Sequence, residues 1–108
     1  MARPSSADDV FRAIADPTRR RILEQLAGGE RPVSELSIEF DVSLPAISQH
    51  LKILRDANLV RARRQGRERI YTLRPAALRE VAEWSEFFAH FWRGKLSNLD
   101  KYLRKNTQ

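Results

Sequence analysis

The sequence contains no cysteine, and this absence rules out several kinds of chemistry at once. Without thiols the chain forms no disulfide framework, no thiolate metal site and no thiol-based redox sensor. It also has no run of about 18 apolar residues that could cross a membrane. No apolar segment of the kind found in export signals follows the first residues, 1–6. We therefore expect a soluble, cytoplasmic protein that does not associate with membranes.

Catalytic motifs are absent as well. The chain has only two histidines and four glycines, with no glycine-rich phosphate loop and no HExxH motif. Two isolated histidines do not supply a nucleophile, a base and an orienting group in one place. We therefore expect no enzymatic activity and no cofactor.

Basic residues, by contrast, are in clear excess. Twenty lysines and arginines face fourteen acidic residues, which gives a net charge of +6 and a pI of about 10.5. Such a surface attracts polyanions, and nucleic acid and acidic membranes both qualify on charge alone. The 108 residues fit one domain, and no repeat or change of composition divides them. We expect a single domain, 1–108, with a short flexible N-terminus.

Three short helices are predicted in the first half of the chain. Apolar spacing predicts one helix over 8–15, a second between Asp16-Pro17 and Gly28-Gly29, and a third ending near Phe40. Aspartate is a good N-cap and proline is tolerated at the first helical position, so the second helix has a clear start. Ser34 is the predicted N-cap of the third helix.

A three-residue break, 41–43, separates this third helix from a longer one. Ser43 can cap the longer helix, in which Ile47, Leu51 and Leu54 form one apolar stripe. Two short helices joined by such a turn form a helix-turn-helix unit, whose second helix can enter a major groove. An ordinary amphipathic helix with a solvated face would show the same pattern. The polar side holds Pro45, Ser48, Gln49, Lys52 and Arg55.

Residues 59–73 alternate in polarity and predict two short strands that turn at Gln65-Gly66. Six arginines lie within residues 61–74, opposed only by Glu68. A solvated hairpin usually mixes both signs of charge, so this concentration favours a wing that lies along a phosphate backbone. The other interpretation is a basic edge that discourages strand pairing. The arginines expected to face DNA are Arg63, Arg64 and Arg67.

Pro75 opens a last helix that is predicted to reach about Lys105 and holds six of the nine aromatic residues. Its apolar arc covers about half the circumference, wider than a surface helix shows. A core helix of a monomer would explain this arc, but a helix that also packs on a second copy is favoured, because little else in a small chain could cover it. The expected dimer contacts are Phe11, Phe87, Phe88, Phe91, Trp92 and Leu99. The predicted fold is mainly α with a small β-hairpin, a winged helix-turn-helix.

Five stretches of the sequence resemble the ArsR/SmtB family of bacterial winged-helix repressors. They are residues 11–23, 33–36, 46–54, 57–60, and 66–67 with 71–73. The resemblance covers about residues 9–75 and implies a homodimer, joined through its first and last helices, that binds an imperfect palindrome at a promoter. It also implies that 44–57 is the recognition helix.

By their place in that motif, Leu44, Pro45, Ser48 and Gln49 fall where the family contacts bases. Together with the charged residues above, the expected contacts to double-stranded DNA are Ser43, Leu44, Pro45, Ser48, Gln49, Lys52, Arg63, Arg64 and Arg67. The rival interpretation is a non-specific nucleic-acid-binding or chromosome-organising protein, because charge alone gives sequence-independent binding. Such a protein does not need the polar face at Ser48 and Gln49.

Many members of the family sense metals, and here the sequence departs from them. Their cysteine motif would fall on the helix that holds 33–40, where there is no cysteine. The family's other site uses several histidines and carboxylates of the last helix, where this chain has His90 with Glu86. Two ligands per chain are too few to form a closed metal site, which usually needs four. We expect no metal site, and the sequence identifies no effector.

Overall fold

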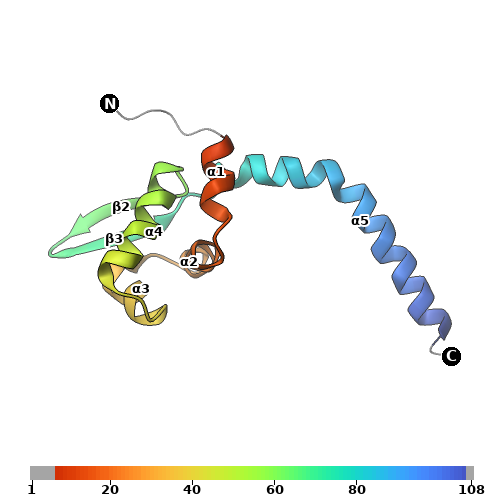
Figure 1. Cartoon of the computed structure of the whole chain (residues 1–108), viewed down its shortest axis with the longest axis horizontal. Coiled ribbons are helices and arrows are strands. Elements are labelled where there is room, and N and C mark those ends of the chain that lie inside the picture. Colours follow the sequence, from red (N-terminus) through yellow and green to blue (C-terminus); the bar gives the residue numbers. More distant parts are fainter. Residues whose placement is uncertain (1–6, 107–108) are drawn as a thin grey trace. The chain divides into compact units, whose positions relative to one another are not determined.

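Helices make up most of the chain, with one small sheet among them. A computed structural model describes residues 7–106 as two units, one up to Leu78 and one from Arg79, and each is described here by itself. The first unit contains α1 (Ala7–Ile14), α2 (Pro17–Ala27), β1 (Arg31–Pro32), α3 (Val33–Glu39), α4 (Leu44–Asp56), β2 (Val60–Gln65), β3 (Glu68–Leu73) and the 3₁₀ helix η1 (Pro75–Leu78) (Figure 1). The second unit is one helix, α5 (Arg79–Asn106).

The joint between α1 and α2 is held by side chains of α2. The Asp16 carboxylate accepts a hydrogen bond from the Arg19 backbone N–H at 3.0 Å, as predicted for an N-cap. That hydrogen bond holds the pKa of Asp16 below its ordinary value. The Arg19 guanidinium donates to the Ala13 carbonyl at 2.7 Å, and Arg20 donates to the Ile14 carbonyl at 2.8 Å. These arginines satisfy carbonyls that the end of α1 leaves without helical partners.

The start of α3 differs from the sequence prediction. The helix begins at Val33, directly after the extended Pro32, and no side chain caps it. The prediction that Ser34 is the N-cap was therefore wrong. Its hydroxyl instead donates to the Glu68 carboxylate of β3 at 3.1 Å. Because Pro32 ends a strand and takes the N-cap position, the helix starts two residues too early for Ser34 to cap it.

The turn between α3 and α4 is closed by two hydrogen bonds between the same pair of residues. The Ser37 hydroxyl donates to the Val42 carbonyl at 2.6 Å, and the Val42 backbone N–H donates to the Ser37 carbonyl at 3.1 Å. Asp41 has a φ of +51°, in the left-handed region that aspartate tolerates better than most residues. The predicted break between the two helices is thus a defined turn.

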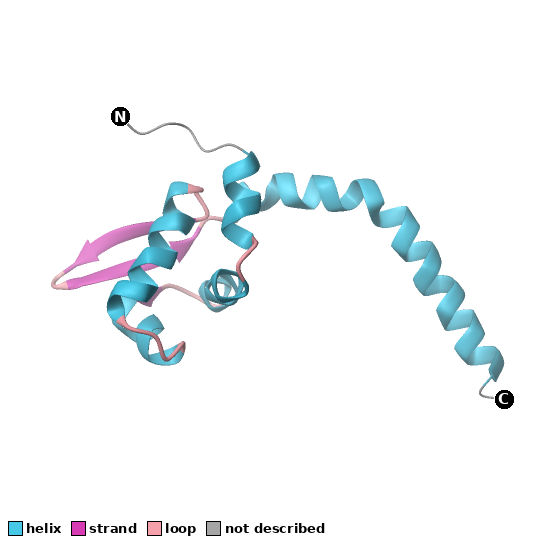
Figure 2. Cartoon of the chain, in the orientation of Figure 1, coloured by secondary structure: helices cyan, strands magenta, loops and turns pink. Residues whose placement is uncertain are grey.

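The sheet has three antiparallel strands in the order β1-β3-β2, where the sequence predicted only a hairpin (Figure 2). A two-residue strand is too short to show alternation, which is why β1 was missed. Pro32 is tolerated in it because β1 lies at the edge of the sheet. The hairpin loop is Gly66-Arg67, one residue later than predicted, and Gly66 has a φ of +64°.

Apolar side chains from α1 to α4 and from the strands form one core in the first unit. Ile22, Leu36, Ile47, Leu51 and Leu54 have no exposed surface. α4 packs against α1, α2, α3 and β2, so its position is fixed from several sides. The predicted last helix begins instead with η1, and the α-helix itself starts at Arg79.

Candidate nucleic-acid interface

Both ends of α4 are fixed by hydrogen bonds. At its start, the Ser43 hydroxyl accepts from the Ala46 backbone N–H at 3.2 Å, as predicted. At its end, the Leu59 N–H donates to the Leu54 carbonyl and the Asn58 N–H donates to the Arg55 carbonyl, both at 2.9 Å. These two bonds, with a φ of +64° at Asn58, form a Schellman motif. The turns at both ends therefore fix the residues at which α4 begins and ends.

α4 has one buried apolar face and one exposed polar face, as the sequence predicts. Ile47, Leu51 and Leu54 are fully buried against the rest of the unit. The opposite face is exposed, and Leu44 keeps 52% of its surface open to solvent. Its other exposed members are Pro45, Ser48, Gln49, Lys52 and Arg55. This face carries apolar, amide, hydroxyl and cationic groups, which are the groups that read base edges and bind phosphates.

A basic hollow lies between this face and the hairpin. One cavity of about 290 Å³ is lined by Val33, Ser48, Lys52, Arg55, Arg69 and Tyr71. A second cavity of about 240 Å³ shares Arg55 and Arg69 with the first and adds Ala62, Arg63 and Arg64. We call the two cavities together the α4–wing groove. In it the recognition helix and the hairpin present cations to the same space.

Strand register decides which arginines of the hairpin face this groove. Ala62 pairs with Tyr71 and Arg64 pairs with Arg69. Side chains alternate along a strand, so Arg64 and Arg69 lie on the same side of the sheet as the buried Tyr71. Arg69 was not among the predicted DNA contacts, although its place two residues before Tyr71 would have put it on the inner side. Arg55 was noted on the polar face of its helix but was not selected.

Arg63 is different, because it already has a carboxylate partner. Its guanidinium donates to both Glu30 carboxylate oxygens, at 2.9 Å for Nη2 to Oε1, and also to the Gln65 side-chain oxygen at 3.0 Å. The hydrogen bond from Arg63 lowers the pKa of Glu30, and the same contact raises the pKa of Arg63. The pair connects β2 to the residue before β1 and neutralises the charge of Arg63 locally.

The two histidines belong to different units of the chain. His50 is half-buried on α4, with its Nδ1 3.4 Å from Nη1 of Arg19, and it does not line the groove. His90 on α5 stacks against Phe91 with ring centroids 4.0 Å apart. Within residues 7–106 no three or more histidine or acidic side chains lie together as a metal site. Nor does this part of the chain contain a helix long and apolar enough to cross a membrane.

Known proteins are similar to this chain both in sequence and in fold. The sequence pattern described as bacterial regulatory protein, arsR family, matches residues 16–62, from the N-cap of α2 into the wing. The transcriptional repressor SdpR of Bacillus subtilis is 39% identical over 77 residues, which are 71% of this chain and 86% of SdpR. The chain belongs to the ArsR family. It is a DNA-binding transcriptional regulator with a winged helix-turn-helix, and it is not an enzyme.

Other ArsR-family relatives support the same assignment. The HTH-type transcriptional regulator Rv2034 of Mycobacterium tuberculosis is 47% identical over 78 residues, 72% of this chain and 73% of that protein. The crystal structure of the ArsR family transcriptional regulator RHA00566 superposes with a TM-score of 0.70 at 35% identity, covering 80% of this chain and 94% of that one.

Proposed function

We propose that this ArsR-family regulator is a repressor that acts as a homodimer on a palindromic operator. The observation that carries the proposal is the α4–wing groove, where an exposed polar helix face and arginines of the hairpin line the same space. α4 inserts into the major groove, where its serine and glutamine meet base edges, while the hairpin follows the phosphate backbone. The proposed contacts are Ser43, Leu44, Pro45, Ser48, Gln49, Lys52, Arg63, Arg64 and Arg67, joined by Arg55 and Arg69.

These contacts do not contribute equally. Arg63 shares its charge with Glu30, so it adds less to phosphate binding than Arg69 does. Gln49 has an amide with donor and acceptor on one group and can bind adenine through two hydrogen bonds. A regulator that works on a promoter acts where the chromosome lies, and we therefore place it in the cytoplasm.

The homodimer rests on the exposed aromatic face of α5. In the single chain Trp84, Phe87 and Phe91 keep 59%, 69% and 57% of their surface exposed. Large apolar patches of this kind mark interaction sites in soluble proteins, since leaving them in water is unfavourable. The proposed contacts are Phe11, Phe87, Phe88, Phe91, Trp92 and Leu99. Two copies joined in this way present two α4 helices to half-sites about one helical turn apart.

Selection from a library of random duplexes tests sequence-specific binding against the non-specific alternative. We expect one enriched sequence with two inverted half-sites. A non-specific binder would enrich none, and that result would overturn the proposal. On the enriched duplex Gln49→Ala is expected to cost about 1–3 kcal/mol while random DNA is bound almost as before. Gln25→Ala, on α2 and away from the groove, is the matched control and should change neither.

Sedimentation tests the dimer. The wild-type chain should sediment at twice its chain mass of 12.5 kDa at micromolar concentration. Phe91→Glu should yield a folded monomer, because burying an unpaired charge between the two copies is costly whereas the single chain leaves the side chain in water. Ala82→Glu places the same charge on an exposed position of α5 outside the arc of these aromatic residues and should remain dimeric. A native chain that sediments as a monomer and still binds the enriched duplex tightly would exclude the dimer.

A further inference from the structure

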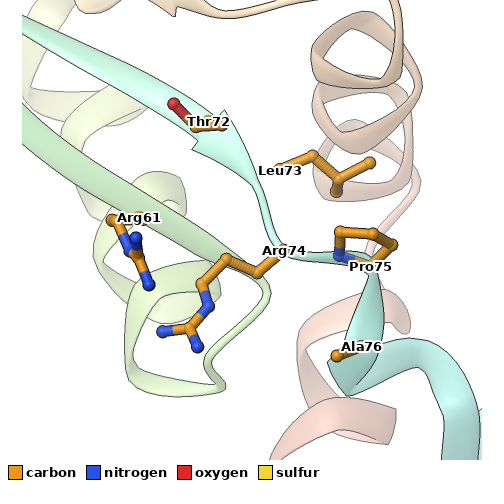
Figure 3. Close-up of a pocket in the computed structure, with 6 residues that line it drawn as sticks. All are labelled: Arg61, Thr72, Leu73, Arg74, Pro75 and Ala76. Atoms are coloured by element: carbon orange, nitrogen blue, oxygen red, sulfur yellow. The ribbon is translucent and has the colours of Figure 1, made fainter.

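A third cavity of the first unit lies on the other side of the sheet from the α4–wing groove. It has a volume of about 300 Å³ and is lined by Arg61, Thr72, Leu73, Arg74, Pro75 and Ala76 (Figure 3). Arg61 pairs with Thr72 across β2 and β3, so both alternate with the buried Tyr71 and point to the opposite face of the sheet. None of the six residues that line this cavity is among the DNA contacts that we propose.

The lining is divided into a cationic half and an apolar half. In Figure 3 the guanidinium groups of Arg61 and Arg74 lie on one side of the cavity, and Leu73, Pro75 and Ala76 lie on the other. Neither guanidinium forms an ion pair within the part of the chain that the structure describes. Two like charges that line one cavity repel each other, and an anion between them removes that repulsion.

The backbone around the cavity is held in place. The Arg74 N–H donates to the Leu59 carbonyl at 2.8 Å, which ties the end of β3 to the residue before β2. Pro75 follows with a fixed φ and begins η1. The arginine side chains are thus carried by a rigid segment, and less freedom is lost when a ligand binds.

We propose that this cavity binds a small organic carboxylate, whose charged group lies between Arg61 and Arg74 and whose apolar body rests on Leu73, Pro75 and Ala76. Guanidinium forks match the two oxygens of a carboxylate, and the Thr72 hydroxyl offers a further donor. The volume holds about ten non-hydrogen atoms when each takes roughly the 30 Å³ of a water molecule. This site gives the regulator an effector class that needs no metal.

Titration calorimetry of the chain without DNA tests the site independently of the operator. Benzoate and hexanoate are the probes, benzyl alcohol is the neutral counterpart, and inorganic phosphate is an anion without an apolar body. We expect both carboxylates to bind, and Arg61→Gln or Arg74→Gln to weaken each about tenfold. Arg64→Gln, on the same strand but facing the α4–wing groove, is the matched control and should leave carboxylate affinity unchanged.

Amide chemical shifts locate the binding. On adding benzoate, the backbone signals of Thr72, Leu73 and Ala76 should move, while those of Ser48 and Gln49 should not. The proposal is overturned if neither carboxylate binds below about 10 mM, or if the Arg61/Arg74 double variant binds them as the wild type does. Equal affinity for benzyl alcohol or for inorganic phosphate would also overturn it.

Binding to random duplex DNA provides the last discriminating measurement. Arg61→Gln and Arg74→Gln should leave DNA affinity and its salt dependence unchanged, because the cavity faces away from the groove. If they reduce the salt dependence while carboxylates fail to bind, the arginines are phosphate contacts and the carboxylate site does not exist. Since the calorimetry contains no DNA, failure of this site and failure of the proposed repressor function give different results.

Discussion

Arg63 and Arg69 differ in whether an acidic side chain neutralises them, and this difference predicts how strongly each affects the salt dependence of DNA binding. Arg69 lines the α4–wing groove with no acidic partner among the described residues, whereas Arg63 is held by Glu30. Each phosphate neutralised contributes about 0.9 to the slope of log affinity against log salt. For a dimer with one such contact in each subunit, Arg69→Gln should reduce the slope by about 1.8. Between 50 and 200 mM salt the variant should then lose about tenfold less affinity than the wild type.

Fluorescence anisotropy with a labelled random duplex measures these slopes. Arg63→Gln should change the slope much less than Arg69→Gln does, because its charge is already neutralised within the protein. Glu30→Gln should increase the slope, since it frees the Arg63 guanidinium and removes a negative charge beside the wing. Lys105→Gln removes one exposed charge from the end of α5 and is the control. Equal reductions for Arg63→Gln and Arg69→Gln would refute the argument that Glu30 already neutralises Arg63.

Substitutions at three positions test the fold. Asp16→Ala should lower the free energy of unfolding by about 0.5–2 kcal/mol in urea titrations, because α2 loses its N-cap. Asn58→Ala should lower it by about 1 kcal/mol and Asn58→Gly should not, since the position requires a φ of +64°. The Glu30 pKa is lowered in the folded state, so the Glu30–Arg63 pair stabilises the fold above the ordinary pKa of 4.5 and loses that effect as the pH falls below it. The stability difference between wild type and Glu30→Gln should accordingly be largest at neutral pH and disappear in acid.

Much of the recognition helix could be predicted from sequence, because its signals are local. Ser43 caps the helix, and Ile47 and Leu51 repeat at helical spacing, and each of these signals acts within a few positions. The partner of Ser34 could not be predicted in this way. Its hydroxyl bonds to Glu68, and nothing near Ser34 in the sequence indicates that β3 lies beside it.

The same limit applies to the choice of arginines. Alternation places Arg63 and Arg64 on opposite faces of the hairpin, but it does not say which face meets α4. That depends on Tyr71 being buried and on Glu30 lying within hydrogen-bond distance of Arg63, and both follow from the tertiary arrangement. Net charge likewise could not distinguish cations that bind DNA from Arg19 and Arg20, which hold the end of α1.

The way α4 is fastened has a consequence for how regulators of this kind diverge. Its caps and its buried stripe hold the helix, while its exposed face takes almost no part in stabilising the chain. Substitutions at Ser48 or Gln49 should therefore leave folding stability within about 0.5 kcal/mol of the original. After gene duplication, a copy could acquire a new operator through a few changes on this face without a compensating mutation elsewhere. Preference for DNA sequence can thus evolve separately from the fold that carries it.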